Sequence, residues 1–214
     1  MTDGDGNGIG GMVAAILRIL VLTFLLGGMA SCSLREPPAV LKLAELPDGG
    51  NICRIAILPF INQSEYSQAD DIFGRVFTSE LINAGNYQVA QEGDVRRFFK
   101  QLQILPNQLP NIEQLRALAD RLEAQIVISG VIVEMRDKNK YDRRLDPAVT
   151  VILRIIEGDS GRTLWATYHR REGNQYRKTM HFGLVNTVAA LAKRVSGEIA
   201  SSWQKEGLLK CSAD

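Results

Sequence analysis

Few residues of this chain have the types and spacing that catalysis requires. Ser160 lies in Gly158-Asp159-Ser160-Gly161, and a serine can act as a nucleophile when a histidine takes its proton and a carboxylate holds that histidine. The chain has two histidines, His169 and His181, and both follow the serine. Gly, Asp and Ser between two β-prone runs are also typical of a hairpin turn, and a turn is what we predict for these four residues.

The four residues are similar to the nucleophile segment of trypsin-like serine proteases, but in those chains the histidine precedes the serine. The chain also lacks the repeated strand pattern of a double β-barrel. Asp70 and Asp71 could pair for proton transfer, yet their place at the expected start of a helix favours a capping role. We therefore predict that the protein is not an enzyme and needs no cofactor or metal.

Cys32 is the residue whose chemistry the sequence indicates most clearly. It follows an apolar run, Ile19 to Leu26, that Arg18 precedes and that ends in small residues. This composition is typical of a secretory signal, and the run is shorter than the roughly 20 apolar residues that span a bilayer. Small residues directly before a cysteine resemble the lipobox of bacterial lipoproteins, in which the cysteine is acylated and becomes the first residue of the mature chain.

The lipobox resemblance implies a signal peptide over residues 1–31 and a lipid anchor on Cys32. Several acyl chains on one residue would hold the protein stably on a membrane, whereas a single chain binds marginally. Met29 stands where leucine is usual, so the alternative is an ordinary cleaved signal followed by an unmodified cysteine. Asp3 and Asp5 are out of place in a signal, and Met12 is an alternative start of translation.

The other two cysteines, Cys53 and Cys211, lie at the edges of the expected folded domain. One precedes its first strand and the other follows its last helix. In an oxidising compartment they are a candidate disulfide, which would stabilise the fold by about 4–5 kcal/mol on the chain-entropy model. Two buried or unpaired thiols are the alternative, and the sequence leaves the choice open. Neither cysteine has a second ligand at zinc spacing.

Hydrophobic spacing predicts the elements that position these residues. Residues 32–53, punctuated by Pro and Gly, predict the lipidated cysteine and a flexible tether, residues 54–206 a folded domain, and residues 207–214 a C-terminal tail. Apolar runs predict strands at 54–60, 87–90, 125–133, 148–156 and 162–169. Helical stripes predict helices at 69–84, 94–104, 112–124 and 178–204.

The order of these elements predicts the fold class. A strand, a helix, a strand and two helices are followed by three strands and a closing helix. We expect an α/β fold with a single mixed β-sheet of about five strands, helices on both faces and a long C-terminal helix. The run at 125–133 does not alternate in polarity and indicates a central strand covered on both sides.

Basic residues gather at two places that the fold should bring together. The charged loop 136–146 and the strand exit after His169 should lie at one end of the sheet, because adjacent strands there are antiparallel. A positive rim at this end would suit an acidic protein surface, phosphate or carboxylate. Its residues are Arg136, Lys138, Lys140, Arg143, Arg144, Arg170 and Arg171. The alternative is a solvated rim whose charge is balanced by Asp137, Asp142, Asp146 and Glu172.

The overall charge argues against one class of binding partner. The chain has 25 basic and 24 acidic side chains, a formal net charge of +1. A nucleic-acid binder would carry a strongly basic face, so we predict no nucleic-acid partner.

Four segments, Ile55–Asn62, Ser79–Gly85, Ala119–Val131 and Asp159–Trp165, together resemble a known group. They are similar to the curli-secretion lipoprotein family, the lipoprotein activators of penicillin-binding proteins, and the amino-terminal domain of the Tol-Pal protein TolB. The resemblance implies the fold and a bacterial envelope location. Ser33 after the anchor, in place of Asp, implies transfer to the outer membrane.

Members of this group form secretion channels, activate a synthase or bind partners in an envelope complex. We expect a lipid-anchored binding protein on the periplasmic face of the outer membrane that docks on another envelope protein or self-associates. The alternative is a subunit of an oligomeric outer-membrane secretion or surface-assembly apparatus. A channel needs lipid-facing strands of about 9–11 residues that alternate in polarity, and loop 136–146 is charged throughout, which favours a soluble ring over a channel.

Overall fold

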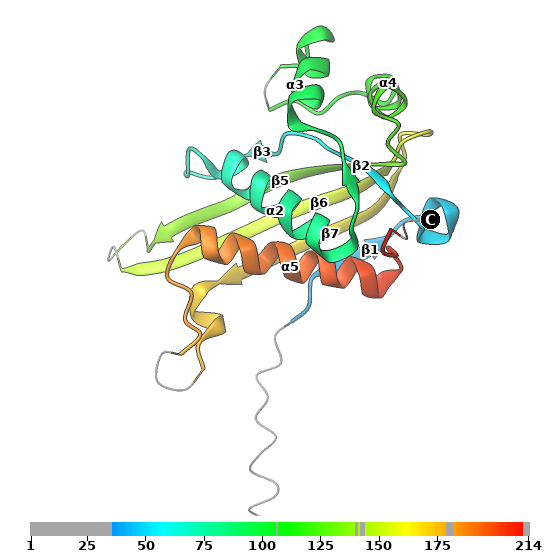
Figure 1. Cartoon of the computed structure of the whole chain (residues 1–214). Coiled ribbons are helices and arrows are strands. Elements are labelled where there is room, and N and C mark those ends of the chain that lie inside the picture. The colour runs from blue at the N-terminus through cyan, green and yellow to red at the C-terminus, as the bar shows by residue number, and fades with distance from the viewer. Residues whose placement is uncertain (1–35, 106, 140, 142–143, 179–181, 212–214) are drawn as a thin grey trace, which may run out of the picture. The chain divides into compact units, whose positions relative to one another are not determined.

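The computed structural model describes residues 36–211 apart from 106, 140, 142, 143 and 179–181 (Figure 1). Seven strands form one mixed sheet in the order β1-β7-β6-β5-β2-β4, and β3 pairs with β5 beyond the end of β2. The strands are β1 (Ala39–Lys42), β2 (Arg54–Ile57), β3 (Ile61–Asn62), β4 (Gln88–Val89), β5 (Ile126–Lys138), β6 (Leu145–Glu157) and β7 (Thr163–Glu172).

The centre of the sheet is an antiparallel ladder of β5, β6 and β7. β5 and β6 are 13 residues long and pair from Ile126 opposite Glu157 to Lys138 opposite Leu145. β7 pairs along the other side of β6, and β1 adds an antiparallel edge strand. β2, β3 and β4 are parallel to their neighbours, as is usual where helices connect strands.

One face of the sheet is covered by α2 (Ala69–Gly85) and α5 (Val188–Glu206), which pack against each other in front of the strands in Figure 1. Phe73 and Phe77 of α2 and Trp203 of α5 are fully buried there. The rings of Phe77 and Trp203 meet edge to face with centroids 5.7 Å apart, a favourable aromatic geometry. The main core therefore lies between these two helices and the sheet.

The other face is covered only in part, by α3 (Glu92–Gln101) and α4 (Ile112–Leu122). Val95, Leu115 and Leu118 of these helices pack over Ala56 and Val127 in a second, smaller core. A capping box at Asn111 and Gln114 fixes the start of α4. On the rest of this face side chains remain exposed, including Tyr168 (49%) and Val133 (41%).

The predicted fold class is confirmed: a mixed α/β sheet with helices on both faces ends in a long C-terminal helix. The sheet has seven strands where about five were expected. The two additional strands, β1 and β3, have four and two residues, too few for a periodic pattern to stand out in the sequence. β1 lies within the segment that we predicted to be a flexible tether, so residues 39–42 of that segment are an edge strand instead.

Two predicted boundaries were wrong. The charged loop 136–146 is shorter than expected, because β5 continues to Lys138 and β6 begins at Leu145, with register shifts near Ile132 and Arg136. The last helix begins at Val188 and not at 178, because Thr187 caps it by accepting a hydrogen bond from the backbone N–H of Ala190 (3.3 Å). The 3₁₀-helix η2 (Gly173–Tyr176) and a loop occupy much of the chain between β7 and α5.

Cys53 and Cys211 form a disulfide, which joins the start of β2 to the segment after α5. Backbone hydrogen bonds hold the same segment: Leu209 N–H donates to Gly50 (2.9 Å) and Cys211 N–H donates to Gly85 (2.9 Å). Residues 207–211, part of the predicted tail, are therefore attached to the domain.

We expect that loss of this disulfide lowers the free energy of unfolding by about 2–5 kcal/mol, because it frees a long loop in the unfolded chain. The comparison is between the wild-type chain and the Cys53→Ser/Cys211→Ser double variant, measured by urea unfolding with and without reductant. Reductant should lower the wild-type midpoint to that of the double variant and leave the double variant unchanged. A wild-type midpoint that does not respond to reductant, although free-thiol titration shows complete reduction, would contradict this stabilising role.

Candidate functional site

Cross-strand pairing builds an apolar row across five strands on the sheet face that α2 and α5 do not cover. The pairs Ala39–Tyr168, Tyr168–Ile152, Ile152–Val131 and Val131–Ile61 place these residues side by side. Residues directly opposite in paired strands point to the same face. All five are at least partly exposed, and Tyr168 is 49% exposed. We call these five residues the apolar row.

The next row, toward α4, mixes apolar and basic side chains. Leu41 pairs with Ala166, Ala166 with Arg154, and Arg154 with Ser129. Leu41 is 60% exposed, and Arg154 is also exposed. We call this row and the apolar row together the open sheet face.

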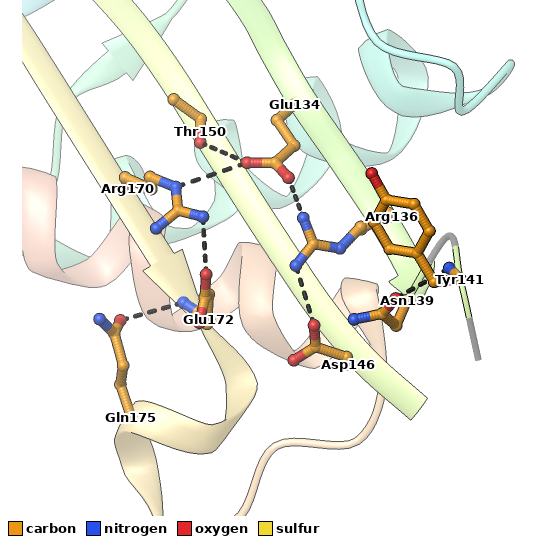
Figure 2. Close-up of polar contacts among 9 residues, drawn as sticks. All are labelled: Glu134, Arg136, Asn139, Tyr141, Asp146, Thr150, Arg170, Glu172 and Gln175. Carbon is orange, nitrogen blue, oxygen red and sulfur yellow. Dashed lines mark hydrogen bonds and ion pairs between the residues drawn. The ribbon is translucent and has the colours of Figure 1, made fainter. Parts of the chain in front are cut away.

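The row on the other side of the apolar row is charged, and its residues are drawn in Figure 2 with the helices behind the strands. Glu134 accepts a hydrogen bond from Thr150 Oγ1 (3.1 Å) and pairs with the guanidinium groups of Arg136 and Arg170, the latter at 3.5 Å. Arg136 also pairs with Asp146 (2.9 Å), and Arg170 with Glu172 (2.6 Å). Three carboxylates thus surround two guanidinium groups, and this charge network is not positive.

The predicted basic rim is only partly assembled. Arg136 and Arg170 lie in the charge network, while Lys138 and Arg144 are exposed at the hairpin that joins β5 and β6. Lys140 and Arg143 lie outside the described residues.

Arg171 does not belong to the rim, and that part of the prediction was wrong. Side chains alternate along a strand, so Arg170 and Arg171 point to opposite faces of the sheet. Arg171 is 6% exposed and lies under α5.

A buried polar cluster surrounds Glu198 of α5, and sequence reasoning did not predict it. The carboxylate accepts hydrogen bonds from His169 Nε2 (2.6 Å), Arg171 Nε (2.8 Å) and the Tyr176 hydroxyl (2.7 Å). Burial by itself would raise the pKa of Glu198, but hydrogen bonds from His169 and Tyr176 and the charge of Arg171 outweigh it and lower this pKa to about 2. Burial and the neighbouring Glu198 raise the pKa of the Tyr176 hydroxyl.

Ser160 and His169 are not brought together. Ser160 lies in the β6–β7 turn, where its hydroxyl donates to Glu157 and accepts from the backbone N–H of Arg162 (3.2 Å). His169 is 3% exposed and faces Glu198 under α5. The prediction of a hairpin turn at Ser160 is confirmed, and His181 lies outside the described residues.

A cavity of about 370 Å³ lies at the other edge of the sheet, between α2 and α3. Apolar residues such as Ile57, Ile82 and Val95 line it, and Arg96 at its rim pairs with Asp71 (3.1 Å) and Glu92 (2.7 Å). In the described part of the chain, no three His, Cys, Asp or Glu side chains are grouped to hold a metal ion. No helix within that part is both long and apolar enough to span a bilayer.

No family model and no curated protein sequence matches the chain. Solved structures do match it. The PelC dodecamer from Paraburkholderia phytofirmans aligns with a TM-score of 0.53 at 16% identity, over 78% of this chain and 97% of that one. This chain has the PelC fold. Lipoprotein GNA1162 from Neisseria meningitidis shares it too, with a TM-score of 0.50 at 14% identity over 72% and 99% of the two chains.

The C-terminal domain of LpoB from Salmonella enterica aligns less well, with a TM-score of 0.42 at 15% identity over 58% of this chain and 86% of that one. At these identities the likeness to PelC and GNA1162 concerns the fold. The resemblance to the curli-secretion family and to TolB stays a prediction.

The lowered pKa of Glu198 predicts a loss of stability in acid. A carboxyl group whose pKa is lowered by folding stabilises the fold above its unfolded pKa near 4.5, and this contribution disappears as the pH falls toward 2. We expect Glu198→Gln to cost about 3 kcal/mol at pH 7, because it leaves Arg171 poorly paired, and to flatten the decline in stability between pH 5 and 3. Urea unfolding at a series of pH values measures both effects.

Glu206→Gln is the matched control, because Glu206 is half exposed on the same helix and pairs with Lys42 at the surface. That variant should lose less than about 1 kcal/mol and keep the wild-type pH dependence. Parallel pH profiles for wild type and Glu198→Gln would contradict the role assigned to this partly buried carboxylate.

Proposed function

We propose that this protein is a lipid-anchored accessory protein of the bacterial envelope, which docks on another envelope protein through its open sheet face without catalysis. The observation that carries the proposal is the apolar row, partly exposed across five strands where the described chain provides no covering helix. Contiguous apolar surface of this kind commonly marks a protein contact.

The charge network beside the apolar row supports docking of a protein. Interfaces place a desolvated apolar centre next to a polar rim, and Glu134, Arg136 and Arg170 provide such a rim in paired form. Ion pairs that exist before the partner binds contribute more to the orientation in which the partner docks than to its affinity. Tyr168 and Arg154, both exposed, are residue types that often contribute strongly to binding.

The anchor is proposed from the sequence around Cys32, which lies outside the described residues. The fold shared with GNA1162, itself named a lipoprotein, supports this assignment. Ser33 after the cysteine supports the periplasmic face of the outer membrane. On this proposal residues 1–31 are removed and the mature chain begins at Cys32.

A second candidate function is favoured by one observation. The PelC structure with the same fold is a dodecamer, so this chain could be one subunit of an oligomeric secretion or surface-assembly apparatus. In that case a second copy would cover the open sheet face. The two candidates differ in what lies against Tyr168.

Photocrosslinking in intact cells separates these candidates. A photoreactive amino acid in place of Tyr168 should give one discrete adduct, whose mass and peptides identify either a different envelope protein or another copy of this chain. The same group at Ser201, exposed on the outer side of α5, is the control and should give none. Adding Arg154→Glu, which reverses an exposed charge on the open sheet face, should reduce the Tyr168 adduct several-fold without changing the thermal midpoint.

Each outcome favours one of the two candidate functions or contradicts both. A different protein supports docking, and a copy of this chain supports the oligomer. Equal patterns from positions 168 and 201, or no adduct at all from position 168, would contradict a role for the open sheet face in either candidate.

The anchor has its own test. Cells grown with a labelled fatty acid should incorporate the label into the wild-type chain and not into Cys32→Ser, because acylation requires the thiol. The label should also survive Cys53→Ser/Cys211→Ser, which keeps Cys32 and removes the other cysteines. Unlabelled wild-type protein would contradict the anchor and leave the docking proposal untouched.

A further inference from the structure

Exposed aromatic and basic side chains gather at one end of the sheet, which the open sheet face does not include. β5 ends there at Lys138, β6 begins at Leu145 and β7 ends at Glu172. Of the side chains there, Tyr141 is 94% exposed, Phe182 75% and Leu145 61%. Large apolar side chains exposed to this degree in one region are unusual on a protein surface that faces only water.

The β5–β6 hairpin and the loop before α5 lie together at this end. Asn139 and Leu145 of the hairpin line one cavity of about 220 Å³ with Asn174 of η2 and Leu184 of the loop before α5. Phe182 closes its own turn, because its carbonyl accepts a hydrogen bond from Lys178 N–H (2.6 Å). Gly183 follows with φ +81°, and a Cβ at that position would lie 2.5 Å from the Tyr176 carbonyl oxygen. The turn is thus closed by its backbone, and the Phe182 side chain within it is exposed.

At this end of the sheet, basic and acidic side chains differ in how far they are exposed to solvent. Among the described residues at this end, the exposed charged side chains are basic except for Glu65, which lines a cavity with Lys138 and Tyr141. The other carboxylates nearby are partly buried, and each accepts a hydrogen bond or forms an ion pair. Asp137 accepts from the Val188 N–H (2.8 Å), and Asp146 and Glu172 pair with Arg136 and Arg170. The exposed basic residues are Lys138, Arg144, Arg177 and Lys178. We call these four residues, with Tyr141, Leu145 and Phe182, the aromatic-basic end.

The direction of β1 connects this end with the proposed anchor. Ala39 pairs with Tyr168 and Lys42 with Trp165, so β1 runs away from the Glu172 end of β7. The chain therefore enters the sheet from the side of the aromatic-basic end. Cys32 precedes Ala39 by seven residues, and an extended chain covers at most about 3.3–3.6 Å per residue. A lipid on Cys32 would hold Ala39 within roughly 25 Å of the bilayer, and the chain reaches Ala39 from the side of the aromatic-basic end.

We infer that the aromatic-basic end rests on the membrane surface, with Tyr141 and Phe182 in the headgroup region and the basic side chains on anionic lipid. This inference rests on the proposed lipid anchor and adds the orientation of the domain. Tyrosine is enriched at membrane interfaces because one end of its ring is apolar and the other polar. Basic side chains near such a surface gain from the negative lipid charge. The near-zero net charge of the whole chain gives no general attraction, so the contact depends on this local arrangement.

Quenching by brominated lipid tests the contact on the full-length lipidated protein. The protein is reconstituted into vesicles of phosphatidylethanolamine and phosphatidylglycerol that contain lipid brominated on the acyl chain. The native tryptophans, Trp165 and Trp203, are at most 2% exposed, so brominated lipid should quench them little, and their emission is subtracted with the wild-type protein. Phe182→Trp should be quenched about twofold or more relative to Leu209→Trp, the matched control, because lipid reaches only the first position. Leu209 is 50% exposed just after the far end of α5.

Vesicle flotation separates the inference from the proposal on which it rests. Protein that fails to float lacks the anchor, which overturns the proposed lipid anchor and this orientation together. Protein that floats, with Phe182→Trp and Leu209→Trp quenched equally, keeps the anchor and overturns the membrane contact alone, which leaves this end for a protein partner. Stronger quenching of Phe182→Trp supports the inference, and its weakening in vesicles of phosphatidylcholine alone supports the role of the basic side chains.

Discussion

The alternation of side chains along the β5–β6–β7 ladder is the constraint on which the rest of this structure depends. A strand sends successive side chains to opposite faces, and pairing over many residues locks that choice for all three strands. On β7 the residues Trp165, Thr167 and His169 face α5, while Ala166, Tyr168 and Arg170 face the other way. A slip of one residue would turn the charge network toward α5 and expose Trp165, Thr167 and His169.

The positions of the buried polar groups under α5 follow from this constraint. Trp203 Nε1 donates to Thr167 Oγ1 (2.7 Å), and Glu198 receives donors from β7 and η2. A partly buried carboxylate such as Glu198 is costly unless donors surround it, and these donors reach it only when α5 lies at one position along the strands. We interpret the Glu198 cluster as fixing the placement of α5 on the sheet more than adding net stability.

The sequence predicted the long elements well, because their patterns are strong. Apolar stripes marked α2 and α4, and a continuous β-prone run marked β5. It could not predict β1 or β3, whose pairing depends on partners distant in the chain. Arg171 was misplaced for a related reason: it adjoins Arg170 in the sequence, and only the register of β7 shows that one faces solvent and the other Glu198. For the same reason the apolar row could not be read from sequence, since its five members come from five strands.

The open sheet face and the aromatic-basic end are consistent with one orientation of a domain held by the proposed lipid anchor. The strands run from the aromatic-basic end toward α4. If the aromatic-basic end rests on the bilayer, the strands extend away from the membrane surface. The open sheet face then stands beside the membrane and does not face it. A partner embedded in or bound to the same membrane could contact Tyr168 and Leu41 laterally, over the short distance that the connection from Cys32 allows. In this proposed arrangement a lipid on Cys32, by holding one end of the ladder, would leave the open sheet face available for a partner.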